Sequence, residues 1–346
     1  MRNWQFFLAA LAVGIGAYAA ARLIGNDYIY FAGYVVLQFV VLATAWNILG
    51  GYCGYVNFGS AAFFAIGAYT TVALHKFPQF SSRYLPEVVN SVVATLFPLP
   101  MPVLIVVGGA IAGLVGFGMG YLTLRLRGVF FAIATLALAV VLQTLIVNWD
   151  YVGGSRGAYV IRPAATPYFG INYIEYLFLI MLLLSIVAIT VARSIERSQL
   201  GYGFATIRDD ELAAEATGVP TLRLKLIATT LSGAFMGMAG APFPFYIGYL
   251  EPSSAFGLAY AVNAIAMPMI GGTTSWVGPL LGAILLGGLQ QIASVTISSA
   301  VSLLIVGLLL VFFVIIAPNG IIGLWHKYFP SKDPDVVERE RSAEAT

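Results

Sequence analysis

Residues 176–246 read YLFLIMLLLSIVAITVARSIERSQLGYGFATIRDDELAAEATGVPTLRLKLIATTLSGAFMGMAGAPFPFY. The stretch begins and ends in apolar runs, and residues 193–223 between them form the most polar internal segment of the chain. Each run is long enough to cross the hydrocarbon core of a bilayer as one helix, which takes about 20 residues. The stretch therefore predicts two membrane spans joined by a charged loop.

The composition extends this pattern to the whole chain of 346 residues. Apolar residues make up 60% and charged residues 9% of it, whereas soluble domains hold about 45–50% and about 25%. We therefore expect an all-α polytopic membrane protein with about ten transmembrane helices. The apolar runs lie near 4–24, 28–48, 56–75, 101–122, 128–149, 172–192, 224–246, 258–271, 277–297 and 300–318.

These runs place one transmembrane domain over residues 1–330. The charged residues 331–346 cannot bury a core and are expected to form a disordered cytoplasmic tail. The first run could also be a signal-peptide core, but its length favours a retained span. Pro268 interrupts the eighth run, which favours a broken or partial span there.

The placement of Lys and Arg predicts the orientation, because positively charged short loops stay in the cytoplasm. With the N-terminus inside, twelve of the 17 Lys and Arg residues fall inside and five fall outside. Both termini and the loop 193–223 are therefore expected in the cytoplasm, which requires an even number of spans. The inside set is Arg2, Arg125, Arg127, Arg193, Arg197, Arg208, Arg223, Lys225, Lys327, Lys332, Arg339 and Arg341, and the outside set is Arg22, Lys76, Arg83, Arg156 and Arg162.

The apolar runs hold almost no acidic residue, histidine or arginine, which ion-driven carriers place inside the membrane. The sequence has no metalloprotease or nucleophile-elbow motif, and Cys53 alone builds neither a disulfide nor a cysteine cluster. We therefore expect no enzyme activity, metal or cofactor, and a net charge of +2 gives no indication of a nucleic-acid partner.

Neutral polar residues remain inside the predicted spans and at their ends. Such residues commonly bond neighbouring helices to each other, and they can also line a path for a solute without net charge. The candidates for such a path are Asn47, Tyr55, Asn57, Ser60 and Asn263.

A short helix is predicted within the loop 193–223. Asp209 or Asp210 can cap its start, and Gly218 followed by Pro220 marks its end. A helix of this length is marginal alone in water. It must therefore dock either on the protein's own surface or in a groove of a partner.

The faces of this helix follow from its spacing. Leu212, Ala213 and Ala216 would form a small apolar face, while Glu211 and Glu215 lie one turn apart and are expected on a solvated side.

Four stretches together resemble the LivM-like branched-chain amino acid permeases of ABC importers. The resemblance implies a Type II-like importer permease fold in the bacterial inner membrane. It also implies a LivH-like second permease subunit, two cytoplasmic ATP-binding subunits and a periplasmic solute-binding protein as partners. The stretches are DELAAEATG from Asp210, NILGGYCGYVNFGSAAFFAIGAY from Asn47, LRLRGVFFAIATLAL from Leu124 and IAMPMIGGTTSWVGPLLGAILLG from Ile265.

The resemblance further implies that the loop helix is the coupling element that contacts the ATPases. None of the four lysines follows a glycine, so a G-K-[ST] P-loop is absent and the ATPase must be another chain. The implied coupling residues are Arg208, Asp209, Asp210, Glu211, Ala213, Ala214, Glu215 and Gly218.

The function implied is that of a non-catalytic permease subunit that imports branched-chain or related hydrophobic amino acids. The same importer architecture carrying urea, short amides or aromatic acids is one alternative. A stand-alone carrier or channel for a small neutral solute is another, since a neutral facilitator needs no charge inside the membrane.

Overall fold

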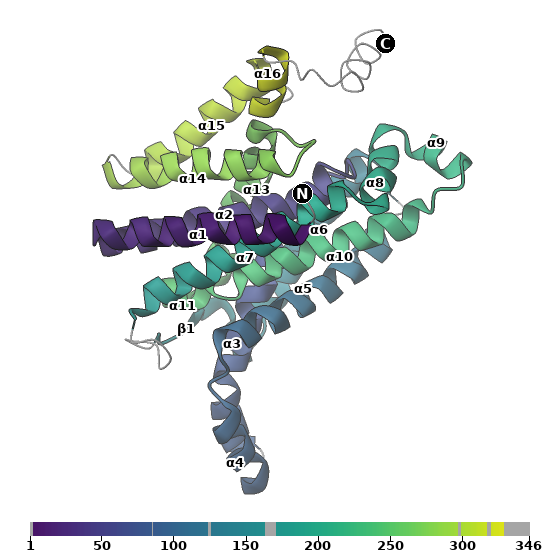
Figure 1. Ribbon diagram of the computed structural model, residues 1–346. Coiled ribbons are helices and arrows are strands. Elements are labelled where there is room, and N and C mark those ends of the chain that lie inside the picture. The colour runs from purple at the N-terminus through teal and green to yellow at the C-terminus, as the bar shows by residue number, and fades with distance from the viewer. Residues whose placement is uncertain are drawn as a thin grey trace.

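The computed structural model describes residues 3–84, 86–123, 126–162, 171–296, 299–316 and 320–328, and most of them are helical (Figure 1). The predicted tail 331–346 lies outside the described residues, as do Arg2, Arg125, Lys332, Arg339 and Arg341 of the orientation argument. The helices of the first half are α1 (Asn3–Ile24), α2 (Asp27–Gly50), α3 (Ser60–Tyr84), α4 (Glu87–Leu96), α5 (Met101–Thr123), α6 (Val129–Val147) and α7 (Tyr173–Glu196). Those of the second half are α8 (Gln199–Asp209), α9 (Glu211–Ala216), α10 (Thr221–Gly240), α11 (Phe243–Ile247), α12 (Pro252–Ala255), α13 (Leu258–Gly271), α14 (Val277–Thr296), α15 (Ser299–Ile316) and α16 (Gly320–Tyr328).

Between α6 and α7 the chain forms two single turns of 3-10 helix, η1 (Asp150–Val152) and η2 (Gly154–Arg156), followed by the strand β1 (Ala158–Tyr159). This strand pairs antiparallel with β2 (Tyr249–Leu250), which follows α11, so that Ala158 lies opposite Leu250. The β1–β2 pair thus joins the connection between α6 and α7 to the segment that follows α11.

Nine of the ten predicted apolar runs each overlap one helix, and the run 224–246 is divided between α10 and α11. Eight helices or helix pairs are long and apolar enough to cross a membrane, namely α1, α2, α5, α6, α7, α10 with α11, α12 with α13, and α14. Helices α3 and α15 are not among them, so the expected number of ten spans stays a prediction. The last turns of α3 are polar because they contain His75, Lys76 and Arg83.

The predicted break at Pro268 is wrong. Helix α13 continues through Pro268 and ends three residues later at Gly271. A proline this close to the end of a helix removes one backbone donor and leaves few turns to distort. The interruption in this span lies instead at Phe256 and Gly257, between α12 and α13.

Helix α10 lies at the centre of the bundle, where it contacts α2, α3 and α5. Glycines permit this close approach: a methyl group at Gly67 of α3 would overlap the carbonyl oxygen of Gly237, and one at Gly240 would overlap that of Phe64. Small residues at such crossings are typical of helices that pack inside a membrane. Many of the chain's glycines are thus explained by packing.

Helices α8 and α9 lie together at one end of the bundle, here called the loop end (Figure 1). Helix α1 begins at this end, because Phe6 packs edge-to-face on Trp276 and lies under the guanidinium of Arg193, near the end of α7. The segment between α13 and α14 also lies there, since a methyl group at Gly51 would meet the carbonyl oxygen of Thr273 at 2.6 Å. The start of α1 and the predicted cytoplasmic loop therefore share one end.

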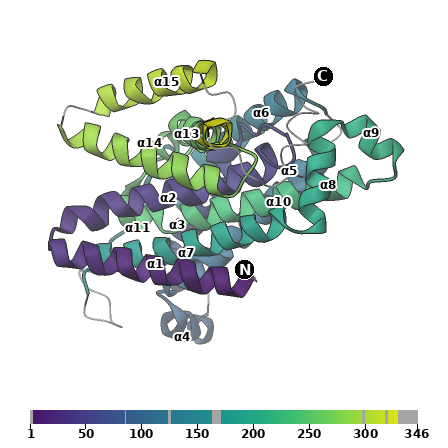
Figure 2. The same cartoon turned by 45° about the horizontal axis from the view of Figure 1, so that its top comes forward.

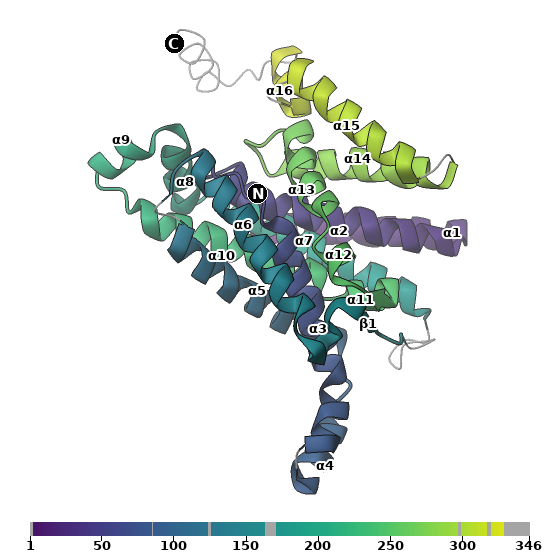
Figure 3. The ribbon, with the colours of Figure 1, turned by 180° about the vertical axis from the view of Figure 1, so that it is seen from behind.

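Two further features complete the arrangement. Figure 2 shows α14 and α15 as an antiparallel pair on one side of the bundle, and α14 packs on both α13 and α2. Figure 3 shows that α3 leads out of the bundle to α4, which projects away from the other helices.

Candidate functional site

The loop 193–223 contains two helices rather than the single short helix that was predicted. Helix α8 precedes α9 and buries Phe204 and Ile207 against the bundle. Its Gly203 lies close to Leu224 of α10, where a methyl group would approach a leucine methyl to 2.7 Å. Tertiary packing thus holds α8 in place despite its two glycines, which disfavour a helix.

Helix α9 is fixed by its own ends. The Asp210 carboxylate accepts hydrogen bonds from the backbone N–H groups of Leu212 at 2.9 Å and Ala213 at 3.1 Å. Gly218 ends the helix with a φ of +88°, a left-handed conformation that glycine adopts without strain. Of the two predicted capping residues, Asp210 is confirmed, while Asp209 is exposed and pairs with Arg208 at 3.3 Å.

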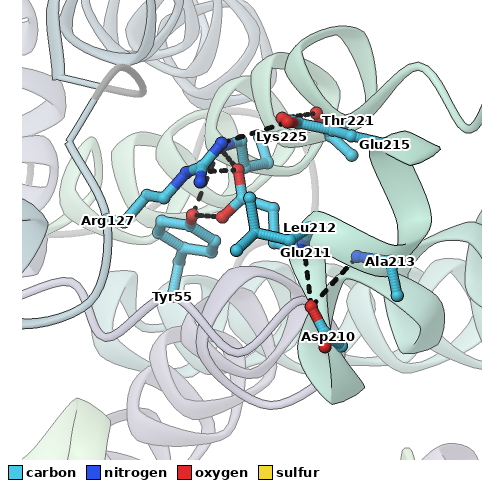
Figure 4. Close-up of polar contacts among 9 residues, drawn as sticks. All are labelled: Tyr55, Arg127, Asp210, Glu211, Leu212, Ala213, Glu215, Thr221 and Lys225. Carbon is cyan, nitrogen blue, oxygen red and sulfur yellow. Dashed lines mark hydrogen bonds and ion pairs between the residues drawn. The ribbon is translucent and has the colours of Figure 1, made fainter.

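Glu211 anchors α9 to the bundle (Figure 4). Lys225 of α10 donates from Nζ to Glu211 Oε1 at 2.6 Å, and the Tyr55 hydroxyl donates a short hydrogen bond to Glu211 Oε2. Arg127 Nε lies 3.6 Å from the same carboxylate. The Glu211 side chain is 12% exposed and that of Lys225 is 2% exposed. The prediction that Glu211 faces solvent is therefore wrong.

The protonation states in this cluster follow from its contacts. Burial acts to raise the pKa of Glu211, but the hydrogen bonds from Lys225 and Tyr55 and the nearby cations outweigh it and hold the pKa below its ordinary value. Burial and the Glu211 carboxylate raise the pKa of Tyr55 well above its ordinary value. Glu211 is thus a carboxylate at neutral pH, and Tyr55 keeps its proton and acts as a donor.

The outer side of α9 differs from the inner side. Glu215 pairs with Arg127 at 3.0 Å, with both side chains close to half exposed, and accepts from the Thr221 hydroxyl at 2.9 Å. Ala214 faces the bundle and is buried. The predicted apolar face, Leu212 with Ala213 and Ala216, is exposed, and Leu212 is 62% exposed.

Three of the predicted path residues cluster near the loop end, and all are buried. Asn57 holds a turn, because its Oδ1 accepts from the backbone N–H of Gly59 at 2.8 Å and its carbonyl accepts from Trp46 Nε1 at 3.0 Å. Asn47 lies in the last turn of α2, and Ser60 begins α3. The contacts of Asn57 fit a structural role, and the role of all three residues in transport stays a prediction.

The other two path candidates bond to other elements. Asn263 of α13 accepts a hydrogen bond from Gln290 of α14 at 2.9 Å and so joins those two helices. Tyr55 belongs to the Glu211 cluster. A cavity of about 540 Å³ between the α1–α2 turn, Arg162 and the start of α7 is lined by none of the five candidates.

Sequence reasoning missed Lys225 and Arg127 as members of the site. Lys225 lies 14 positions from Glu211, beyond a helix end, so no helical spacing connects the two. One signal was available: Lys225 falls inside the predicted span 224–246, and a charge in a span needs a partner.

Comparison with known proteins places these features in a family. Residues 28–314 match the model of the branched-chain amino acid transport system / permease component family. The chain belongs to this family. It is accordingly a multi-pass protein of the inner membrane and a transport subunit rather than a catalyst.

Individual relatives agree with the family match. The chain is 28% identical over 314 residues to the high-affinity branched-chain amino acid transport system permease protein LivM of Escherichia coli, covering 84% of this chain and 69% of LivM. It is 26% identical over 285 residues to the probable branched-chain amino acid transport permease protein LivH of Methanocaldococcus jannaschii, covering 76% and 89%. The autoinducer 2 import system permease protein LsrC of Yersinia enterocolitica is 27% identical over 190 residues, covering 52% and 51%. No solved structure matches significantly.

Proposed function

We propose that this chain is the permease subunit of an ATP-driven importer for branched-chain or related hydrophobic amino acids, and that a separate ATPase subunit docks on α9. The observation that carries the docking proposal is the exposed apolar face of α9. Leu212 is 62% exposed, although the cap at Asp210 and the ion pair of Glu211 hold the first turn of the helix in place. A rigid helix with an exposed apolar face suits a groove on a partner.

The anchoring of α9 gives the docking surface a mechanical connection to the membrane helices. Glu211 joins α9 to Lys225, which lies at the first turns of α10, and α10 is the central helix of the bundle. A displacement of α9 by the ATPase therefore displaces α10 as well. Rocking of α10 against α2, α3 and α5 would then alternate the access to a central path.

The complete transporter in this proposal contains further chains. A LivH-like permease subunit pairs with this one, two ATPases bind on the cytoplasmic side, and a periplasmic solute-binding protein delivers the solute. The relatives with LivM and LivH names support the pairing and the amino acid cargo. The same architecture with urea, short amides or aromatic acids as cargo remains the alternative for the solute.

Substitution of Leu212 tests the docking. The permease is co-expressed with its neighbouring importer subunits, extracted in detergent and captured by an affinity tag. With Leu212→Asp we expect loss of the co-purified ATPase and of solute-stimulated ATP hydrolysis, because a carboxylate would be buried unpaired in the partner's groove. Leu212→Met is the matched control and should retain both.

The stand-alone carrier gives a different result in the same experiment. Such a carrier would bring down no nucleotide-binding subunit, and the purified chain alone would move solute in vesicles without ATP. Capture of the ATPase by the Leu212→Asp protein at the unsubstituted level would overturn the docking site on α9.

A further inference from the structure

Residues 51–59 connect α2 to α3 as a non-helical segment, here called the bridge segment. Most of it is enclosed by protein: Gly51, Tyr52, Cys53, Tyr55, Asn57 and Gly59 are buried, while Gly54, Val56 and Phe58 are exposed. Non-helical backbone at the boundary of a membrane helix is tolerated where protein surrounds it. The two halves of this segment contact different elements of the structure.

The first half of the bridge segment touches the elements of the charged loop. The Tyr55 hydroxyl donates to Glu211 of α9 and accepts from Lys225 Nζ at 3.2 Å. Gly54, with a φ of +78°, lies so close to α8 that a methyl group there would be 3.0 Å from Arg208 Cγ and 3.2 Å from Arg208 Cα. This half of the segment therefore packs directly against α8 and α9.

The second half of the segment is joined to membrane helices. Trp46 of α2 donates from Nε1 to the Asn57 carbonyl at 3.0 Å, and the backbone N–H of Phe58 donates to Thr135 Oγ1 of α6 at 3.2 Å. The Asn57 side chain closes the turn that leads into α3. One short segment thus contacts α8 and α9 at one side and α2, α3 and α6 at the other.

We propose that the bridge segment is a second route, beside α10, by which movement of α9 reaches the membrane helices, and that Tyr55 is the positioning residue of this route. Only Val56 separates Tyr55 from the Asn57 turn, so a shift of the Tyr55 backbone acts directly on that turn. The Tyr55 backbone is expected to move with α9, because the Tyr55 hydroxyl bonds to both Glu211 and Lys225. The proposal rests on the docking of an ATPase at α9.

Tyr55→Phe isolates the hydroxyl. The ring keeps its edge-to-face contact with Phe131 at 5.0 Å and its place 4.7 Å from Lys225 Nζ, so the fold is expected to survive. In the reconstituted complete transporter we expect the ATPase still to be captured, because Lys225 still holds Glu211 and the Leu212 surface is unchanged. The number of solute molecules moved per ATP should fall about tenfold, since a hydrogen bond to a charged group is lost. The control is Tyr121→Phe, an exposed tyrosine of α5.

Cys53 supplies a second, structural readout. It is the only cysteine of the chain, and burial raises the pKa of its thiol to about 12, so it reacts slowly at rest. Its modification by N-ethylmaleimide is followed by mass spectrometry of this chain, with and without vanadate trapping of ATP. We expect the trapped state to change the rate in the unsubstituted complex and the Tyr121→Phe complex, and much less in the Tyr55→Phe complex.

Each result decides between defined alternatives. An unchanged transport-to-hydrolysis ratio in Tyr55→Phe overturns the role of Tyr55, while the docking proposal stands if Leu212→Asp still loses the ATPase. An identical Cys53 rate in both states of the unsubstituted complex also overturns the route, because the segment then does not move. Failure of the unsubstituted chain to capture any ATPase refutes the docking proposal itself.

Discussion

The pair between Glu211 and Lys225 should behave as a buried ion pair when its two members are replaced. Nζ and Oε1 are 2.6 Å apart, and the two side chains are 2% and 12% exposed for lysine and glutamate. At an effective dielectric constant near 20, two unit charges about 4 Å apart attract by about 4 kcal/mol. Removal of one partner from a buried pair typically costs about 3–5 kcal/mol.

A double-mutant cycle measures this term. We expect Glu211→Gln and Lys225→Met each to lower the free energy of unfolding by about 3 kcal/mol or more, because each leaves a charge in a poorly hydrated site. The double variant should lose far less than the sum, which gives a coupling energy of at least about 2 kcal/mol. Unfolding is followed by circular dichroism during SDS titration in mixed micelles.

The matched control lies on the same helix. Glu215→Gln removes an ion pair with Arg127 in which both side chains are close to half exposed, and its cost should stay below about 1 kcal/mol. A coupling energy below about 0.5 kcal/mol between Glu211 and Lys225 would place that pair in the same class as the exposed one. The argument that Glu211 anchors α9 to α10 would then fail.

Three further predictions concern the caps, the packing and the pH dependence. Asp210→Ala should destabilise α9 by about 1 kcal/mol, and Asp209→Ala should have little effect, as measured by the rate of tryptic cleavage in the loop. Gly67→Ala should cost about 2 kcal/mol or more because its methyl group overlaps α10, whereas Gly118→Ala, with nothing within 4 Å, should be neutral in thermal unfolding. The lowered pKa of Glu211 contributes stability that is fully present above its ordinary pKa of about 4.3 and lost as the pH falls through the folded value. The difference in unfolding free energy between the unsubstituted protein and Glu211→Gln should therefore shrink below about pH 4.

The membrane helices could be predicted because a continuous run of about 20 apolar residues is typical of a membrane span and of few other structures. All ten runs fall on helices, but the run 224–246 is divided between α10 and α11, and the remaining errors in the bounds lie at the ends of the runs. Helix α3 starts at Ser60 instead of residue 56 because the Asn57 side chain holds a turn at that point. The cap at Asp210 was predictable because it is a local contact: a capping carboxylate and its N–H partners lie within three residues of each other.

The interior of the site could not be predicted because its contacts are remote in sequence. Tyr55 and Glu211 are separated by 156 positions, and only the packing of α2 and α10 brings them together. Helix α8 contains Gly201 and Gly203, which disfavour a helix locally, and its stability comes from burying Phe204 against the bundle. Propensity is a weak guide where tertiary contacts decide.

The distribution of polarity on α9 favours one of the two docking alternatives that the sequence left open. A helix that merely covers its own protein's surface would turn Leu212 inward and leave Glu211 in water, because burying a charge is costly. The structure has the opposite arrangement: Glu211 is 12% exposed and Leu212 is 62% exposed. The cost of burying Glu211 is offset by Lys225, Tyr55 and Arg127, and the apolar face stays available on the outside. A helix with a buried charge and an exposed apolar face is favoured when a second protein covers that face. The buried Glu211 would then transmit the movement of α9 to the membrane helices.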